Sequence, residues 1–102
     1  MDQMARSLVV EVIDIQGHCP VYQIGDTFRI VDGYKLVSDK PLCMHSLQSI
    51  APYYVALSRR IPSEDLGLAG PDGYAYVQCL DPRRYTGGGT VTFKVKVEDE
   101  QG

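Results

Sequence analysis

The side chains best suited to chemistry in this chain are its three cysteines, Cys19, Cys43 and Cys79. They are far apart in the sequence, and no two of them form the close pair that structural zinc sites usually take from one tight turn. The two histidines lie beside them, His18 next to Cys19 and His45 two residues after Cys43. Thiolate and imidazole suit zinc, and thiolates also suit iron–sulfur clusters and cuprous ion. These five residues predict a metal site, provided that the fold brings them together.

Two other interpretations of the cysteines stay open. Cysteine is among the most buried residue types without any special role, and Cys79 alternates with Ala75 and Val77 as a core residue would. A reactive thiol at Cys19 or Cys43 is the other interpretation. A nucleophile needs a base within reach, and His18 is the only histidine adjacent to a cysteine. Because no complete catalytic constellation is present, the sequence favours a role without catalysis.

Composition and charge exclude several classes of protein. The length of 102 residues fits one domain over residues 1–102, with an ordered core at about residues 7–97. A formal net charge of −3 gives no reason to expect nucleic acid binding, which needs a clustered positive face. We find no stretch long enough to cross a membrane and no signal-peptide pattern. An odd number of cysteines without secretory features is typical of a reducing compartment, so we expect a cytoplasmic protein.

Hydrophobic periodicity predicts two strands, a helix and two more strands. The strands are expected at residues 7–15, 27–31, 74–80 and 91–97. Capping candidates at 38–41 precede a helical apolar stripe made of Cys43, Leu47, Ile50, Tyr54 and Leu57. Since Pro52 lies inside this stripe, we expect a kink near Gln48 or two short helices.

This order of elements indicates an α+β domain. It predicts a small, mainly antiparallel four-stranded sheet with one kinked helix, in the order β-β-α-β-β. The first strand is apolar on both faces and is expected to be an inner one. A β-grasp-like arrangement is one candidate because it shares this order of elements.

The glycine run Gly87-Gly88-Gly89 invites comparison with a phosphate-binding loop. Consecutive glycine amides can cradle an anion, but a P-loop also needs a lysine directly after the glycines and a helix to follow. Here the run leads into a strand. We therefore interpret the glycines as structural, serving positive φ angles or close backbone approach. Nearby, Asp81-Pro82 can place a carboxylate beside Cys79, although Asp-Pro more often begins a turn.

The strand at residues 74–80 carries the most distinctive candidate contact surface. One helix can cover only one face of the sheet, so Tyr74, Tyr76 and Gln78 are expected on the open face. Tyrosine is common in contact surfaces because it joins an apolar ring to a polar hydroxyl. These three residues are the predicted partner-binding or self-association surface, and the alternative is an ordinary solvent face.

The order of several short motifs resembles that of an uncharacterised family of short prokaryotic proteins. The motifs are Cys19-Pro20, Gly25-Asp26, Cys43 before a tyrosine-bearing helix, Cys79-Leu80-Asp81-Pro82 and the segment at 85–93. The resemblance covers about residues 7–97 and rests on the order and spacing of the motifs. It implies that the three cysteines form one set, and it implies no particular activity.

The sequence therefore predicts a small cytoplasmic binding or accessory domain, either a non-catalytic subunit with a protein partner or a homo-oligomer. The first alternative is a zinc- or iron–sulfur-binding protein that uses Cys19, Cys43 and Cys79, with His18 or His45 as the fourth ligand. The second alternative is a thiol-dependent enzyme.

Overall fold

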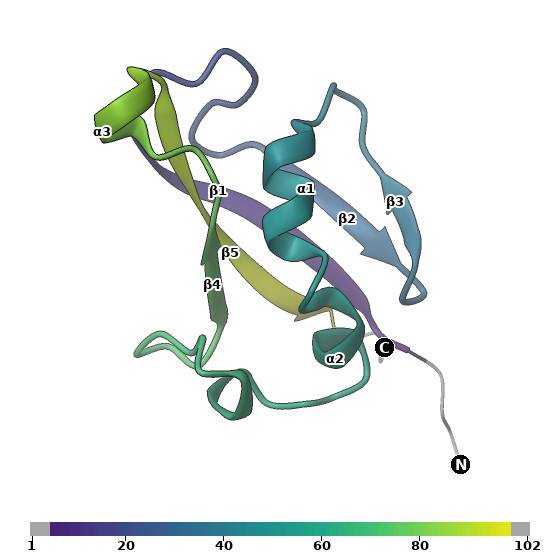
Figure 1. Ribbon diagram of the computed structural model, residues 1–102. Coiled ribbons are helices and arrows are strands. Elements are labelled where there is room, and N and C mark those ends of the chain that lie inside the picture. The colour runs from purple at the N-terminus through teal and green to yellow at the C-terminus, as the bar shows by residue number, and fades with distance from the viewer. Residues whose placement is uncertain (1–4, 99–102) are drawn as a thin grey trace.

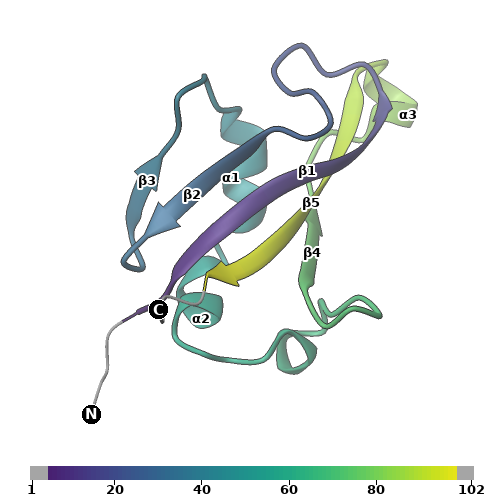
Figure 2. The same ribbon diagram turned by 180° about the vertical axis from the view of Figure 1, so that it is seen from behind.

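The computed structural model describes residues 5–98 and shows an α+β fold in which helices cross one face of a sheet (Figure 1). The strands are β1 Ser7–Gly17, β2 Thr27–Val31, β3 Lys35–Val37, β4 Ala75–Gln78 and β5 Gly89–Glu98. The helices are α1 Met44–Ile50, α2 Tyr54–Ser58 and α3 Arg83–Thr86, with a 3₁₀ turn, η1, at Ser63–Leu66. Figure 2 shows the opposite side, where β1 and β5 lie in front of the helices.

The sheet has five strands in the order β3-β2-β1-β5-β4, and every neighbouring pair is antiparallel. β1 lies between β2 and β5, which confirms the prediction of an inner strand. The β-grasp comparison is wrong, because a β-grasp sheet pairs its first and last strands in parallel, whereas β1 and β5 run antiparallel. The chain crosses from β3 at one edge to β4 at the other through α1 and α2.

Buried side chains alternate along the strands, as expected for a sheet that is covered on one face. Phe93 lies at the centre of this core, with its ring edge-on to those of Tyr22 and Phe28. Ile50 of α1 and Leu57 of α2 close the core from the helical side. The buried strand residues are Leu8, Val10, Val12, Phe28, Ile30, Ala75, Val77, Val91, Phe93 and Val95.

An irregularity in β1 determines where the strand ends. The register with β5 shifts between Val12 and Asp14, so that Ile15 pairs with Val91 and packs against the core. Such a bulge bends the strand and increases its twist. Pairing then continues to the end of the sheet, where Gly17 lies opposite Gly89. The loop that carries His18 and Cys19 starts at this point.

The prediction of four strands is wrong because β3 was missed. β3 has only three residues, all exposed, so it lacks the alternating burial that marks a strand in sequence. Its signal was the turn before it, since Asp-Gly is a strong hairpin sequence. Asp32 and Gly33 both have positive φ, 58° and 91°.

Of the two alternatives predicted at Pro52, the kinked helix is wrong and two short helices are confirmed. They are α1 and α2, and Pro52 lies in the turn between them, at residues 51–53. A proline there cannot donate the hydrogen bond that would continue α1. The first helix starts after Cys43, which is its N-cap, and not at the capping candidates at 38–41.

Candidate functional site: a cysteine-lined pocket

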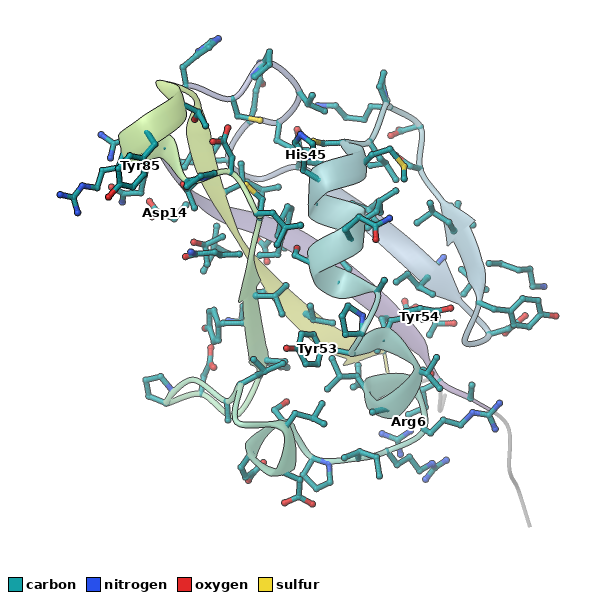
Figure 3. The ribbon with its side chains drawn as sticks, viewed as in Figure 1. Arg6, Asp14, His45, Tyr53, Tyr54 and Tyr85 are labelled. Carbon is teal, nitrogen blue, oxygen red and sulfur yellow. The ribbon has the colours of Figure 1, made fainter. Side chains whose placement is uncertain are left out.

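All three cysteines and both histidines of the chain line one pocket, which has a volume of about 160 Å³. The pocket lies where β1 ends, where α1 begins and where β4 leads into α3. Figure 3 labels His45 in the first turn of α1 at this end of the molecule. The fold therefore brings five residues together from three separate segments: Cys19, Cys43, Cys79, His18 and His45.

Cys79 is anchored to the sheet just beyond β4. Its backbone N–H donates to the carbonyl of Val91, at 2.8 Å. Its thiol accepts from the N–H of Val91 at 3.4 Å and donates to the carbonyl of Gly89 at 3.6 Å. The side chain is buried and belongs to the hydrophobic core, as the packing interpretation expected. Cys79 is thus both a core residue and part of the pocket wall.

Gly89 holds the loop of Cys19 against the sheet. A Cβ atom built on Gly89 would lie 2.6 Å from the carbonyl carbon and oxygen of His18 and 2.9 Å from the nitrogen of Cys19. These are backbone atoms, so only glycine allows the approach. Together with the positive φ of 74° at Gly87, this contact supports the structural interpretation of the glycine run.

Cys43 is held by a closed ring of hydrogen bonds. Its backbone N–H donates to the hydroxyl of Tyr22 at 3.1 Å, and the hydroxyl of Ser46 donates to its carbonyl at 2.7 Å. The two hydroxyls are 2.7 Å apart. Since the hydrogen of Ser46 is directed to Cys43, the phenol must be the donor between the hydroxyls. Both peptide groups of Cys43 are therefore fixed by the same buried pair.

Tyr22 also contacts the second cysteine. Its backbone N–H donates to the sulfur of Cys19 at 3.4 Å. Burial raises the pKa of the Tyr22 phenol, and the nearby Cys43 and Cys19 thiols act in the same direction. The phenol therefore stays protonated and keeps its role as a donor. Tyr22 and Ser46 were not among the candidates from sequence, because a tyrosine in a loop carries no signal of its tertiary partners.

Asp81 adds a carboxylate to the wall of the pocket. It is half-buried, and the hydroxyl of Thr86 donates to it. Its backbone carbonyl accepts from the hydroxyl of Thr90 at 2.8 Å and from the N–H of Arg83 at 3.0 Å. Both sequence interpretations of Asp81-Pro82 therefore apply, because Asp81 begins a turn and also lies near Cys79.

The candidate metal ligands line one pocket but do not surround a single metal position. Among residues 5–98, no three His, Cys, Asp or Glu side chains lie close enough together to hold one metal ion. His18 and His45 are exposed, and neither imidazole is hydrogen-bonded to a thiol within that range. Binding one zinc ion would thus require the side chains that line the pocket to move closer to one another.

The tyrosines of the predicted contact surface are engaged with their own chain. The Tyr76 hydroxyl donates to Asp72 at 2.7 Å, and Lys94 lies 2.8 Å from the same carboxylate. The Lys94 ammonium is also 4.7 Å from the centre of the Tyr74 ring. Hydrogen bonds from Lys94 and then Tyr76 lower the pKa of Asp72 to about 2. Tyr76 and Gln78 line one pocket and Tyr74 another, so the three residues do not share a single site.

Comparison with known proteins gives no relative from which a role could be transferred. A scan against protein-family models and searches of curated proteins and of solved structures found no match to this chain. Within the described residues, the helices are too short or too polar to cross a bilayer.

Proposed function

We propose that the protein is a small binding domain that holds one thiophilic metal ion, Zn²⁺, in the cysteine pocket. The ligands are Cys19, Cys43 and Cys79, with His18 or His45 as the fourth. The observation that carries this proposal is that every cysteine and every histidine of the chain lines the same pocket, although they come from three distant segments. Cysteines that only filled the core would have no reason to gather with the histidines.

The donor set suits a single ion better than a cluster. Three thiolates and one imidazole form a Cys₃His set, which is common for structural zinc. An iron–sulfur cluster usually takes four cysteines, and this chain has three. The pocket of about 160 Å³ is also small, so an ion held directly by the side chains fits it better than a large organic ligand.

Metal binding would be coupled to closure of the pocket. Cys79 is fixed by β5, and Cys43 by Tyr22 and Ser46, so these two residues provide the rigid half. Cys19 and His18 lie on the loop between β1 and β2, whose backbone lies against Gly89, so their side chains provide the part that moves. Zinc–sulfur bonds of about 2.3 Å would draw these side chains inward, and each thiol would lose its proton on binding.

A closed Cys₃His site leaves no open position for a substrate, which is why we favour a binding or accessory role over catalysis. The proposal includes a reducing, cytoplasmic setting, in which thiols stay available as ligands. A protein partner or a second copy at Tyr74, Tyr76 and Gln78 remains a prediction.

The test is the zinc and labile-sulfide content of the full chain, purified without oxygen and without a metal-binding tag. Cys19→Ser and Cys43→Ser are compared with Met44→Leu, which changes an exposed sulfur-bearing side chain next to Cys43 outside the pocket. We expect near-stoichiometric zinc in the wild type and in Met44→Leu, and its loss in both serine variants. His18→Gln and His45→Gln then identify the fourth ligand.

Two outcomes would contradict the proposal. Metal-free protein in which one cysteine is alkylated rapidly and selectively would favour a thiol-dependent enzyme. Metal-free protein with three inert thiols would leave the cysteines as packing residues.

A further inference from the structure

A second pocket lies at the other end of β1 and carries a different chemistry. Its volume is about 530 Å³, and it is formed by the chain before β1, α2, the segment that leads into η1 and the end of β5. Figure 3 labels Arg6 beside α2 in this region. Two arginines, Arg6 and Arg60, line it together with the apolar side chains of Leu57, Val95 and Val97.

These two arginines differ from most other cations of the chain. Every lysine of the described chain, and Arg29, forms an ion pair with a carboxylate. Within residues 5–98, neither Arg6 nor Arg60 has such a partner. The protein has a net charge of −3, so acidic groups are not scarce. Arg6 and Arg60, which have no carboxylate partner among residues 5–98, therefore line the same hollow of an acidic protein.

The backbone at Arg60 is the second observation. The N–H of Arg60 donates to the carbonyl of Leu57 at 3.3 Å, and that of Ile61 donates to the carbonyl of Ala56 at 3.1 Å. This pair of bonds is the Schellman ending of a helix, in which the left-handed residue is usually glycine. Here that residue is Arg60, with φ of 74°. A side chain in this conformation is unfavourable, so retaining one indicates a use for it.

Helix capping does not explain that use. A cation in the last turn is favoured by the helix dipole, but Arg59 already provides one at the C-cap of α2. The dipole of α2 does not need a second positive charge one residue later, at Arg60, where the backbone is left-handed. The guanidinium instead lines the pocket that Arg6 shares.

We propose that this pocket binds an organic monocarboxylate, with the carboxylate on Arg6 and Arg60 and an apolar body over the accessible side chains of Ile61 and Val97. Guanidinium groups bind carboxylates through paired, charge-assisted hydrogen bonds. Glu64 also lines the pocket, and its charge disfavours a ligand with a second negative group. The volume lies within the range of ordinary small-molecule sites. This site is separate from the cysteine pocket and does not depend on metal binding.

The test is a titration of the full chain with benzoate, followed by changes in the protein's amide NMR spectrum. Arg60→Gly is the decisive variant, because glycine accepts the left-handed backbone and removes the Arg60 side chain without straining the fold. We expect benzoate affinity to fall about tenfold or more, while the melting temperature stays the same or rises by a few degrees. Arg6→Gln should weaken binding similarly, and Arg84→Gln, an exposed cation outside this pocket, should not.

Acetate and inorganic phosphate serve as the comparison probes. Acetate lacks the apolar body and should bind more weakly than benzoate, and phosphate should bind more weakly because of Glu64. Benzoate that binds Arg60→Gly as tightly as the wild type, or that does not saturate the wild type, overturns the proposal. So does phosphate that binds as tightly as benzoate. A lower melting temperature in Arg60→Gly would contradict the claim that the arginine is kept at the expense of stability.

Discussion

The cysteine pocket and the open face of the sheet are both rich in polar side chains, but they use them in opposite ways. At the pocket, the cysteines are held by buried groups: Cys79 by backbone atoms of β5, and Cys43 by the hydroxyls of Tyr22 and Ser46. On the open face, Lys94, Asp72 and Tyr76 pair with one another in solvent. The pocket therefore depends on buried partners that cannot rearrange, whereas the open face consists of side chains that can.

This difference matters for function, because a ligand site needs donors that are held in place while their bonding capacity remains available. The thiols of the pocket meet that condition, since their sulfurs make only weak hydrogen bonds. The carboxylate of Asp72 on the open face already accepts from two charged or polar partners. We therefore place the binding function at the pocket.

The largest effect is expected from adding a methyl group to a glycine in each region. At Gly89, the new Cβ would meet backbone atoms of His18 and Cys19, which cannot move without displacing the loop. We expect Gly89→Ala to lower the free energy of unfolding by about 3 kcal/mol. At Gly70, the obstacle is the ring of Tyr76, at 2.3 Å, which can swing into solvent. Gly70→Ala should therefore cost clearly less, as measured by urea denaturation.

If Gly70→Ala were as damaging as Gly89→Ala, the contrast between a fixed pocket and an adaptable face would fail. Neither glycine has a positive φ, so the comparison is not confounded by backbone strain.

A smaller effect is expected from removing one phenolic hydroxyl in each region. Tyr22→Phe keeps the ring against Phe93 but leaves the N–H of Cys43 without its acceptor and the hydroxyl of Ser46 without its donor. We expect a loss of about 2 kcal/mol in unfolding free energy and about 10- to 100-fold weaker zinc binding. Tyr76→Phe loses only an exposed bond to Asp72 and should change neither quantity measurably.

Ser46→Ala provides the matched check, since Ser46 belongs to the same hydrogen-bonded ring as Tyr22. The double variant should lose less than the sum of the single losses, because either change alone breaks the ring. Additive losses would show that the two hydroxyls act independently.

The smallest effect concerns the open face at low pH. Hydrogen bonds from Lys94 and Tyr76 hold the pKa of Asp72 at about 2, below its value of 3.8 in an unfolded chain. A lowered folded-state pKa means that this contribution is complete above about pH 4 and is lost as the pH falls through about 2. As the pH falls from about 4 to about 2, the melting temperature of Asp72→Asn should therefore decrease less than that of the wild type. Asp65→Asn, in exposed η1, should behave like the wild type.

The sequence was sufficient where a pattern repeats along one element. The alternation of β5 identified its buried and open faces, and the prediction for β2 has the same bounds as the strand in the structure. It was insufficient where structure depends on one turn or on a tertiary contact. β3 depends on the Asp32-Gly33 turn, and α3 has only four residues, too few to show a helical pattern in the sequence.

The candidate site shows the same limit. Residue types alone nominated the cysteines and histidines, because few side chains can bind a soft metal. Their meeting depends on the bulge near Asp14, which leaves no local signal, and on the contact of Gly89 with Cys19. The glycine run indicated a close backbone approach, but not which segment approaches it. The ring around Cys43 could not be predicted either, since it joins residues that are 21 positions apart.

The most direct test of the central claim is X-ray absorption at the zinc edge of the zinc-loaded full chain. The account predicts three sulfur ligands at about 2.3 Å and one nitrogen in the wild type, and no bound zinc in Cys19→Ser. A shell of nitrogen and oxygen alone, or a sulfur shell unchanged in Cys19→Ser, would contradict it.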